Sequence, residues 1–258
     1  MKIKNLFLTA KLTLIVLTFL LVGSCSKSNV ELPNEETALL TKSASMRVQP
    51  LSTPEFGTLA QAWVKWIVTF PVDNNPFTDE TGALQGTNQP YDEGIYFLGG
   101  STGPGFNRTV SIPAQYTQVF VPLANVWTWY AECDPENYPA NGESGEEWLG
   151  FISMWVKHPV TLKVKLNKQN MIKSNFDQYR GLTEAFVTNT HYSWANGRGT
   201  CGADNQNFNP TYLADGYWLL LSIPDSNSTL EIEGGINFNQ HGGKSGIFRN
   251  GVTYNIIR

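Results

Sequence analysis

Residues 215–223 read Asp-Gly-Tyr-Trp-Leu-Leu-Leu-Ser-Ile, and Pro224-Asp225-Ser226-Asn227 follows directly. The apolar run 216–223 has the length and composition of a buried strand. The four residues after it favour a turn, and 229–233 is typical of a further strand. This part of the chain therefore predicts two strands joined by a turn, with no helix between them.

The same pattern recurs along most of the chain. Short β-rich segments bounded by Gly, Pro and Asn occur at 94–98, 109–112, 118–123, 160–166, 185–188 and 252–257. Strands and helices do not alternate, which disfavours a parallel α/β sheet. We predict a mainly β fold, a jelly-roll-like β-sandwich with two helices packed on it.

Two segments have helical periodicity. The first is predicted to be capped by Thr58, with Gln61 as its capping-box partner, and to end before Pro71. Its apolar residues share one face, and core packing explains Trp63 and Trp66 better than a ligand platform does. The second helix is predicted over 144–157.

The N-terminus has the features of an export signal. Lys2 and Lys4 precede an apolar stretch from Leu12 to Leu21 that is too short to span a bilayer comfortably, and Cys25 follows soon after. The segment resembles a bacterial lipoprotein signal, which implies cleavage before Cys25 and lipid, palmitate included, on the new N-terminal cysteine. We expect a signal peptide over 1–24, a lipidated flexible tether over 25–50 and one β-sandwich domain over 51–258.

This anchor predicts a protein of the bacterial cell envelope, held at the outer membrane, with the periplasmic or surface face left open. The formal net charge is −4 and only 16% of the residues are charged, with no basic stripe. Nucleic acid is therefore not an expected partner. The oligomeric state is left open.

Two cysteines remain after Cys25. Cys133 and Cys201 form an even pair in an exported domain, and neither has a CxxC neighbour, so a disulfide is the favoured interpretation. Two buried free thiols are the alternative.

Several short motifs resemble those of a family of uncharacterised secreted bacterial proteins with a β-sandwich domain. They are the Trp63-Val64-Lys65-Trp66 helix, the following Phe70-Pro71, the Asn75–Gly82 stretch, the Gly94–Gly100 strand, Asp215–Leu221 and Val252-Thr253-Tyr254. Leu84 and Ser228-Thr229 depart from the family pattern. The resemblance implies a secreted β-sandwich and no activity.

Catalytic motifs are weak. Gly99–Gly103 matches GxSxG, and the order Ser101, Asp215, His241 fits a hydrolase triad. That motif needs a helix directly after the serine, which Pro104 and Gly105 disfavour, so a glycine-rich hairpin loop is the preferred interpretation. Glu132, Asp134 and Asp215 have no spacing that marks them as a glycosidase pair.

No metal or cofactor is expected. His158, His191 and His241 are far apart and lack metal-binding spacing. The oxygen-rich segment from Asp73 to Thr81, with Asp79, would suit calcium, but Asx-turn chemistry explains the same residues without an ion.

Aromatic residues remain the strongest functional signal. Trp127, Trp129 and Tyr130 follow a strand, and Tyr192 and Trp194 begin the loop that contains Cys201. A Cys133–Cys201 bridge would draw the two sets together as a ligand-binding surface suited to glycans. The alternative is that Trp127 and Trp129 alternate into the core.

The favoured function is therefore a membrane-anchored binding or accessory module, for glycans, without its own catalysis. The alternatives are a secreted carbohydrate-active hydrolase or lyase on the same scaffold, and a purely structural envelope protein. Exposed rings on one edge would favour binding, whereas a cleft of convergent titratable groups would favour an enzyme.

Overall fold

The computed structural model describes residues 47–91, 94–135, 152–154, 156–157, 159–172, 175–237 and 247–258. The predicted signal peptide, Cys25 and the tether before residue 47 lie outside these residues, as do His158 and His241. Among the described helices, none is both long and apolar enough to cross a membrane.

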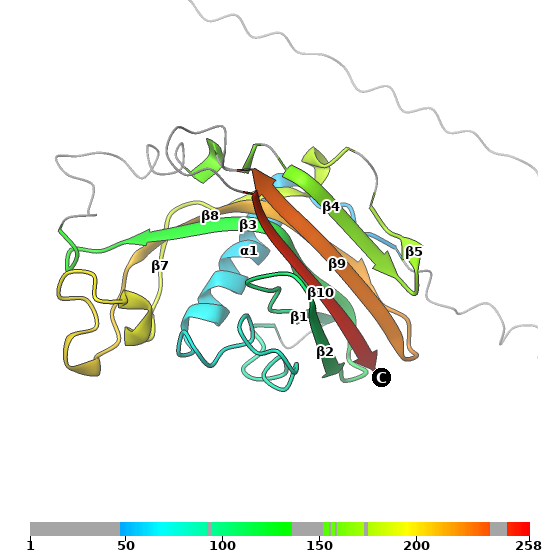
Figure 1. Cartoon of the computed structure of the whole chain (residues 1–258), viewed down its shortest axis with the longest axis horizontal. Coiled ribbons are helices and arrows are strands. Elements are labelled where there is room, and N and C mark those ends of the chain that lie inside the picture. Colours follow the sequence, from blue (N-terminus) through cyan, green and yellow to red (C-terminus); the bar gives the residue numbers. More distant parts are fainter. Residues whose placement is uncertain are drawn as a thin grey trace, which may run out of the picture. The chain divides into compact units, whose positions relative to one another are not determined.

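Two β-sheets packed together form the domain (Figure 1). The first sheet has the order β1-β3-β8-β6, and a fifth strand, β7, also pairs with β8; the second has the order β2-β10-β9-β4-β5. The prediction of a mainly β sandwich is confirmed. The strands of the first sheet are β1 (Gly94–Phe97), β3 (Tyr116–Tyr130), β8 (Thr211–Ser222), β6 (Arg180–Leu182) and β7 (Phe186–Val187), and those of the second are β2 (Phe106–Ser111), β10 (Ile247–Ile257), β9 (Ser228–Asn237), β4 (Pro159–Leu166) and β5 (Gln169–Asn170).

The strand pairing is mixed. β1 pairs with β3 and β2 pairs with β10 in parallel, whereas the remaining pairs are antiparallel. The jelly-roll topology is therefore not confirmed. The predicted turn at 224–227 connects β8 to β9, so the chain passes there from the first sheet to the second.

β8 is apolar on both faces because both of its faces are buried. Leu219 and Leu221 point into the core between the sheets, together with Ile232 of β9. Trp218 and Leu220 point to the opposite face, where α1 covers the first sheet. A strand covered on both sides has no reason to alternate polar and apolar residues, which explains its continuous apolar run.

The N-cap of helix α1 (Thr53–Val68) is Ser52, six residues before the predicted cap, Thr58. Its capping box is Ser52 with Glu55, and the Ser52 backbone N–H donates to the Glu55 carboxylate at 2.7 Å. Hydrogen bonds from the Ser52 backbone and hydroxyl lower the pKa of Glu55. Thr58 lies inside the helix and donates to the Pro54 carbonyl at 3.1 Å.

Trp63 and Trp66 belong to the core, as predicted. Trp63 is fully buried, and its Nε1 donates to the Leu98 carbonyl at 2.9 Å. Of the second predicted helix, residues 152–154 and 156 are helical, Lys157 is in a turn, and the rest lies outside the described residues.

The domain begins before residue 51. Val48 forms a bridge with Leu221, and the Gln49 backbone N–H donates to the Leu220 carbonyl at 2.9 Å. These two residues, which we assigned to the flexible tether, therefore extend the first sheet beside β8.

Candidate functional site

Trp127, Trp129 and Tyr130 lie within β3 and not after a strand, so the prediction for them was wrong on this point. A disulfide joins the segment just after β3 to the loop that carries Tyr192 and Trp194. Cys133 follows β3 and Cys201 follows the short 3-10 helix η4 (Tyr192–Ala195), and their Cα atoms lie 5.0 Å apart. The predicted bridge is confirmed, and the free-thiol alternative is excluded. Figure 1 shows the yellow loop after β7 at the end of the long β3–β8 ladder.

Further contacts hold the same two loops together. The Nε of Arg198 lies 2.6 Å from the Asp134 carboxylate, and the Thr200 backbone N–H donates to the Cys133 carbonyl at 2.7 Å. Gly199 has a φ of +53°, and a Cβ there would lie 2.0 Å from the Cys133 carbonyl oxygen. Only glycine fits this contact, so the disulfide is one part of a tightly packed junction.

The loop is also attached to the end of α1. Trp194 Nε1 donates to the Phe70 carbonyl at 2.8 Å, and the His191 backbone N–H donates to the Val68 carbonyl at 2.9 Å. The Ser193 hydroxyl accepts the Val72 N–H at 2.9 Å. The loop is thus fixed on two sides, which restricts the positions of its aromatic side chains.

Trp127 and Trp194 come together as the sequence suggested. Both are half-buried, and their ring centroids lie 5.2 Å apart in an edge-to-face contact. Tyr192 is also half-buried, and its ring packs on His191 with centroids 4.3 Å apart. We call Trp127, Tyr192 and Trp194 the aromatic end.

Trp129 and Tyr130 do not join the aromatic end. Trp129 is 6% exposed and packs on Phe208, and the Arg198 guanidinium lies 3.7 Å from its ring centre. The core alternative therefore applies to Trp129. Tyr130 lies on the opposite face of β3 from Trp127 and Trp129, because successive strand residues alternate between faces.

A hollow of about 320 Å³ lies in the loop that contains Tyr192 and Cys201. Tyr192 and Ser193 contribute to its wall, and the rest comes from small residues and glycines between Ala195 and Ala203. It adjoins the aromatic end and offers backbone groups to a ligand.

Sequence reasoning missed Arg198, which makes both the ion pair with Asp134 and the contact with the Trp129 ring. The only local signal is its position between two glycines close to Cys201. Its partners lie more than 60 residues away in the sequence, so no local pattern could identify them.

Ser101 is not placed as a nucleophile. It is 1% exposed, and its hydroxyl donates to the Gly103 carbonyl at 2.9 Å. The chain after it continues into β2 and not into a helix. A Cβ at Gly99 would lie 2.2 Å from the Pro76 carbonyl oxygen, so this glycine of the motif serves packing.

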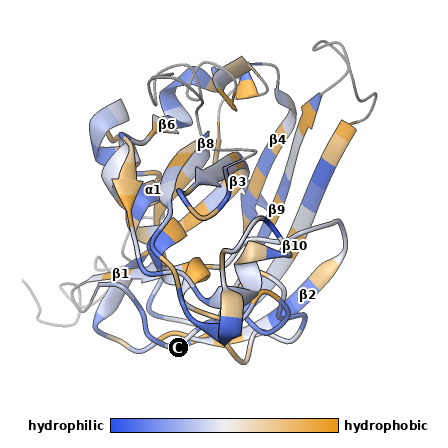
Figure 2. Cartoon of the chain, turned by 90° about the vertical axis from the view of Figure 1, so that its left-hand side faces the viewer, coloured by the Kyte–Doolittle hydropathy of each residue, from blue (hydrophilic) through white to orange (hydrophobic). Residues whose placement is uncertain are grey.

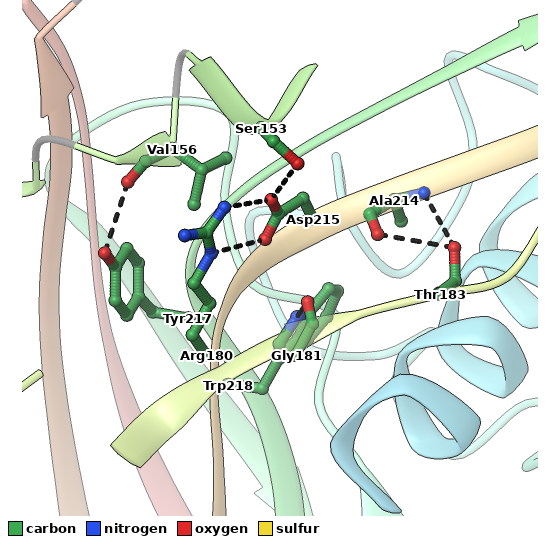
Figure 3. Close-up of polar contacts among 9 residues, drawn as sticks. All are labelled: Ser153, Val156, Arg180, Gly181, Thr183, Ala214, Asp215, Tyr217 and Trp218. Atoms are coloured by element: carbon green, nitrogen blue, oxygen red, sulfur yellow. Dashed lines mark hydrogen bonds and ion pairs between the residues drawn. The ribbon is translucent and has the colours of Figure 1, made fainter. Parts of the chain in front are cut away.

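Asp215 forms a buried ion pair with Arg180 (Figure 3). Arg180 donates from Nε at 3.0 Å and from a terminal nitrogen at 2.5 Å, and the Ser153 hydroxyl donates to the same carboxylate at 2.8 Å. The hydrogen bond to Asp215 raises the pKa of Arg180. Asp215 lies within β8 and not at a turn, and its oxygens are occupied by these donors.

The three carboxylates considered for a glycosidase thus have separate surroundings. Asp134 and Asp215 are buried beside different arginines, and Glu132 is exposed. These contacts account for both aspartates as structural ion pairs.

The Asp73–Thr81 segment is a set of side-chain-capped turns. Asp79 accepts the Thr81 N–H and hydroxyl at 2.9 and 2.7 Å and the Leu84 N–H at 2.8 Å. Burial alone would raise the pKa of Asp79, but these hydrogen bonds outweigh it and lower the pKa. Among the described residues, no group of three or more His, Cys, Asp or Glu is placed to hold a metal ion.

No family model, curated protein or solved structure matches this chain. The family resemblance of the sequence motifs therefore stays a prediction, and the function is argued from the site.

Proposed function

We propose that this protein is a lipid-anchored envelope lipoprotein of the outer membrane whose β-sandwich binds a glycan at the aromatic end. The observation that carries the proposal is a group of half-buried rings: Trp127 near the end of β3, and Tyr192 and Trp194 on the loop that a disulfide and an ion pair attach just after that strand. Rings held in place before binding lose little conformational freedom when a ligand stacks on them.

The chemistry of this end suits sugars. Trp and Tyr rings offer flat apolar faces for the C–H faces of a pyranose, and polar groups nearby complement its hydroxyls. Asn207 accepts the Tyr192 N–H at 3.2 Å and donates to Asn189 at 3.2 Å, and Asn196 is exposed on the same loop. A mixture of rings and amides is a reasonable basis for glycan recognition.

The position at which the tether enters the domain also supports a binding site at the aromatic end. The Arg47 carbonyl accepts the N–H of Ser222, which pairs with Gln118 at the start of the β3–β8 ladder. Trp127, the residue of the aromatic end on β3, pairs with Ala214 nine residues further along the strand. At about 3.3 Å per residue, the aromatic end lies about 30 Å along the ladder from the point where the tether joins it.

We expect Trp127→Ala and Tyr192→Ala each to weaken glycan binding by about tenfold, since a stacked aromatic ring contributes about 1 to 2 kcal/mol. Affinity electrophoresis of the mature protein in gels containing a panel of neutral and acidic polysaccharides measures the effect. Tyr91→Ala, a half-buried ring that packs on Phe97, is the matched control.

Retardation of the wild type by none of the polysaccharides, or equal retardation of wild type and both variants, would refute the aromatic end as a glycan site. Release of reducing ends or of unsaturated products from the panel would favour the hydrolase or lyase alternative.

Lipidation at Cys25 has its own test. We expect Cys25→Ala to abolish incorporation of labelled palmitate and to move the protein out of the membrane fraction, because the acyl chains supply the anchor. Cell fractionation and metabolic labelling measure both effects, with Ser26→Ala as the control. Unchanged membrane retention of Cys25→Ala would contradict the lipoprotein assignment.

A further inference from the structure

The second sheet has a polar outer face. Along β9 and β10, one set of alternate residues points into the core, and the other set points away from it. Figure 2 shows hydrophilic and hydrophobic residues along these strands. Side chains of the outward set include Glu231 and Glu233 on β9 and Arg249 and Thr253 on β10. Solvation alone explains such a face, so a binding site on it needs further evidence.

The first piece of evidence is a hollow of about 400 Å³ on this sheet. Its wall on one side is the Pro104-Gly105 segment, which precedes β2, and Thr161 of β4 lies on the other side. Gly251 lies between them and leaves the sheet without a side chain at that point. The volume falls in the range of small-molecule sites, about 300 to 1,000 Å³.

The second piece of evidence is that the fold does not require glycine at 251. Its φ is not in the left-handed region, and a Cβ there would meet nothing closer than the Pro104 Cα at 3.6 Å, an ordinary contact. Gly234 of the same sheet differs, because a Cβ there would lie 1.7 Å from the Leu123 carbonyl oxygen. Glycine inside a strand is unfavourable and often marks close approach of a ligand or of another backbone segment, and the Pro104-Gly105 segment beside Gly251 leaves room for a Cβ.

The charges around the hollow favour an anion. Glu233 pairs with Lys163 at 2.9 Å and Glu231 pairs with Lys165 at 3.7 Å, so each carboxylate has a cation beside it. Arg249 is exposed, lines the hollow and makes no ion pair within the described part of the chain. A planar guanidinium without a partner is suited to bind a carboxylate with two parallel hydrogen bonds.

We propose that this hollow binds a hexuronate unit of an acidic glycan, with the sugar over Gly251 and its carboxylate on Arg249. Glu231 and Glu233 accept hydrogen bonds from sugar hydroxyls, and Asn107 and Thr253 supply further polar partners at the rim. This site is on the other sheet from the aromatic end and does not depend on it.

Gly251→Val and Arg249→Gln test the proposal in the full-length protein, purified in a non-ionic detergent. Isothermal titration calorimetry with trimers of galacturonate, glucuronate and mannuronate should detect binding of at least one trimer. Both variants should weaken that binding by about tenfold or more, and added salt should weaken it in the wild type. The matched neutral trisaccharide should bind more weakly.

Thermal unfolding separates a binding role from a structural one. Gly251→Val should leave Tm unchanged or raise it, because the Cβ has room and valine favours strands. Thr109→Val, an exposed change on β2 outside the hollow, is the control for binding and Tm.

Three results would overturn the proposal: no binding of any uronate trimer, equal binding by wild type and both variants, or a large fall in Tm for Gly251→Val. Loss of uronate binding in Trp127→Ala but not in Gly251→Val would assign the acidic glycan to the aromatic end instead. Loss of uronate binding in Gly251→Val but not in Trp127→Ala would support the hollow as the uronate site, even if the aromatic end binds no glycan.

Discussion

Arg180→Met should lower the free energy of unfolding by about 3 to 5 kcal/mol, because it leaves the Asp215 carboxylate buried without its cation. The Asp215 side chain is fully buried, whereas that of Arg180 is 26% exposed. Methionine keeps much of the arginine's apolar stem, so the loss reports the unpaired charge more than the lost packing. Urea unfolding of the mature protein, followed by tryptophan fluorescence, measures the change.

Two further variants make this expectation specific. The double variant Arg180→Met/Asp215→Leu removes both charges and should recover most of the stability, since an apolar pair of similar size can replace a buried ion pair. Lys163→Met breaks the exposed pair with Glu233 and should change the free energy of unfolding by less than about 1 kcal/mol. Equal losses in Arg180→Met and Lys163→Met would contradict the role assigned to the buried pair.

The Asp215–Arg180 pair connects three parts of the domain. Asp215 lies on β8 and Arg180 begins β6, and Ser153 adds a hydrogen bond from the second helical segment (Figure 3). The Tyr217 hydroxyl donates to the Val156 carbonyl at 3.2 Å, which attaches the same helical segment a second time. These contacts explain why a charged residue is found within a strand that is otherwise mostly apolar.

The same strand shows how far local sequence patterns reach. The apolar run 216–223 was sufficient to predict a strand, but β8 begins at Thr211 and includes Asp215. The partner that makes Asp215 acceptable inside the sheet is 35 residues away in the sequence. Such a partner has no signal in the local pattern.

The start of α1 was mispredicted because two capping boxes lie close together. Ser52 with Glu55 and Thr58 with Gln61 both satisfy the local rule, and the chain uses the first. The residues between the two starts decide the outcome: Pro54 suits the first helical turn, and Phe56 is buried against the sheet. Burial of Phe56 is a tertiary effect, which the capping pattern does not contain.

The aromatic residues were located correctly in the sequence but only partly in space. β3 has an irregular register between Pro122 and Ala124, after which regular pairing with β8 continues to Tyr130. That pairing puts Trp127 and Trp129 on one face and Tyr130 on the other. Trp129 is then covered by Arg198, which is held there by a buried aspartate. The disulfide was predictable because only two cysteines remained, whereas this ion pair was not.

Cys201→Ser should lower the free energy of unfolding by about 4 kcal/mol, because the bridge restricts a long loop in the unfolded chain. The two cysteines are 68 residues apart in the sequence. Cys133→Ser and the double variant should lose about the same amount as Cys201→Ser, since any one of these changes removes the whole bridge. Urea unfolding with and without a reducing agent measures the loss, and the reductant should destabilise only the wild type.

The disulfide also allows stability and binding to be separated. The Arg198–Asp134 ion pair and the Thr200–Cys133 hydrogen bond involve neither sulfur atom, so we expect the folded loops to keep their contact without the bridge. At temperatures well below its Tm, Cys201→Ser should therefore bind glycan at the aromatic end less than tenfold more weakly than the wild type. The double variant Arg198→Met/Cys201→Ser should lose more binding than Arg198→Met or Cys201→Ser alone. An unfolding free energy that is unchanged in Cys201→Ser would show that the bridge does not stabilise this end. Equal glycan binding in the wild type and the double variant would show that the disulfide and the Arg198–Asp134 ion pair do not position the aromatic rings for a ligand.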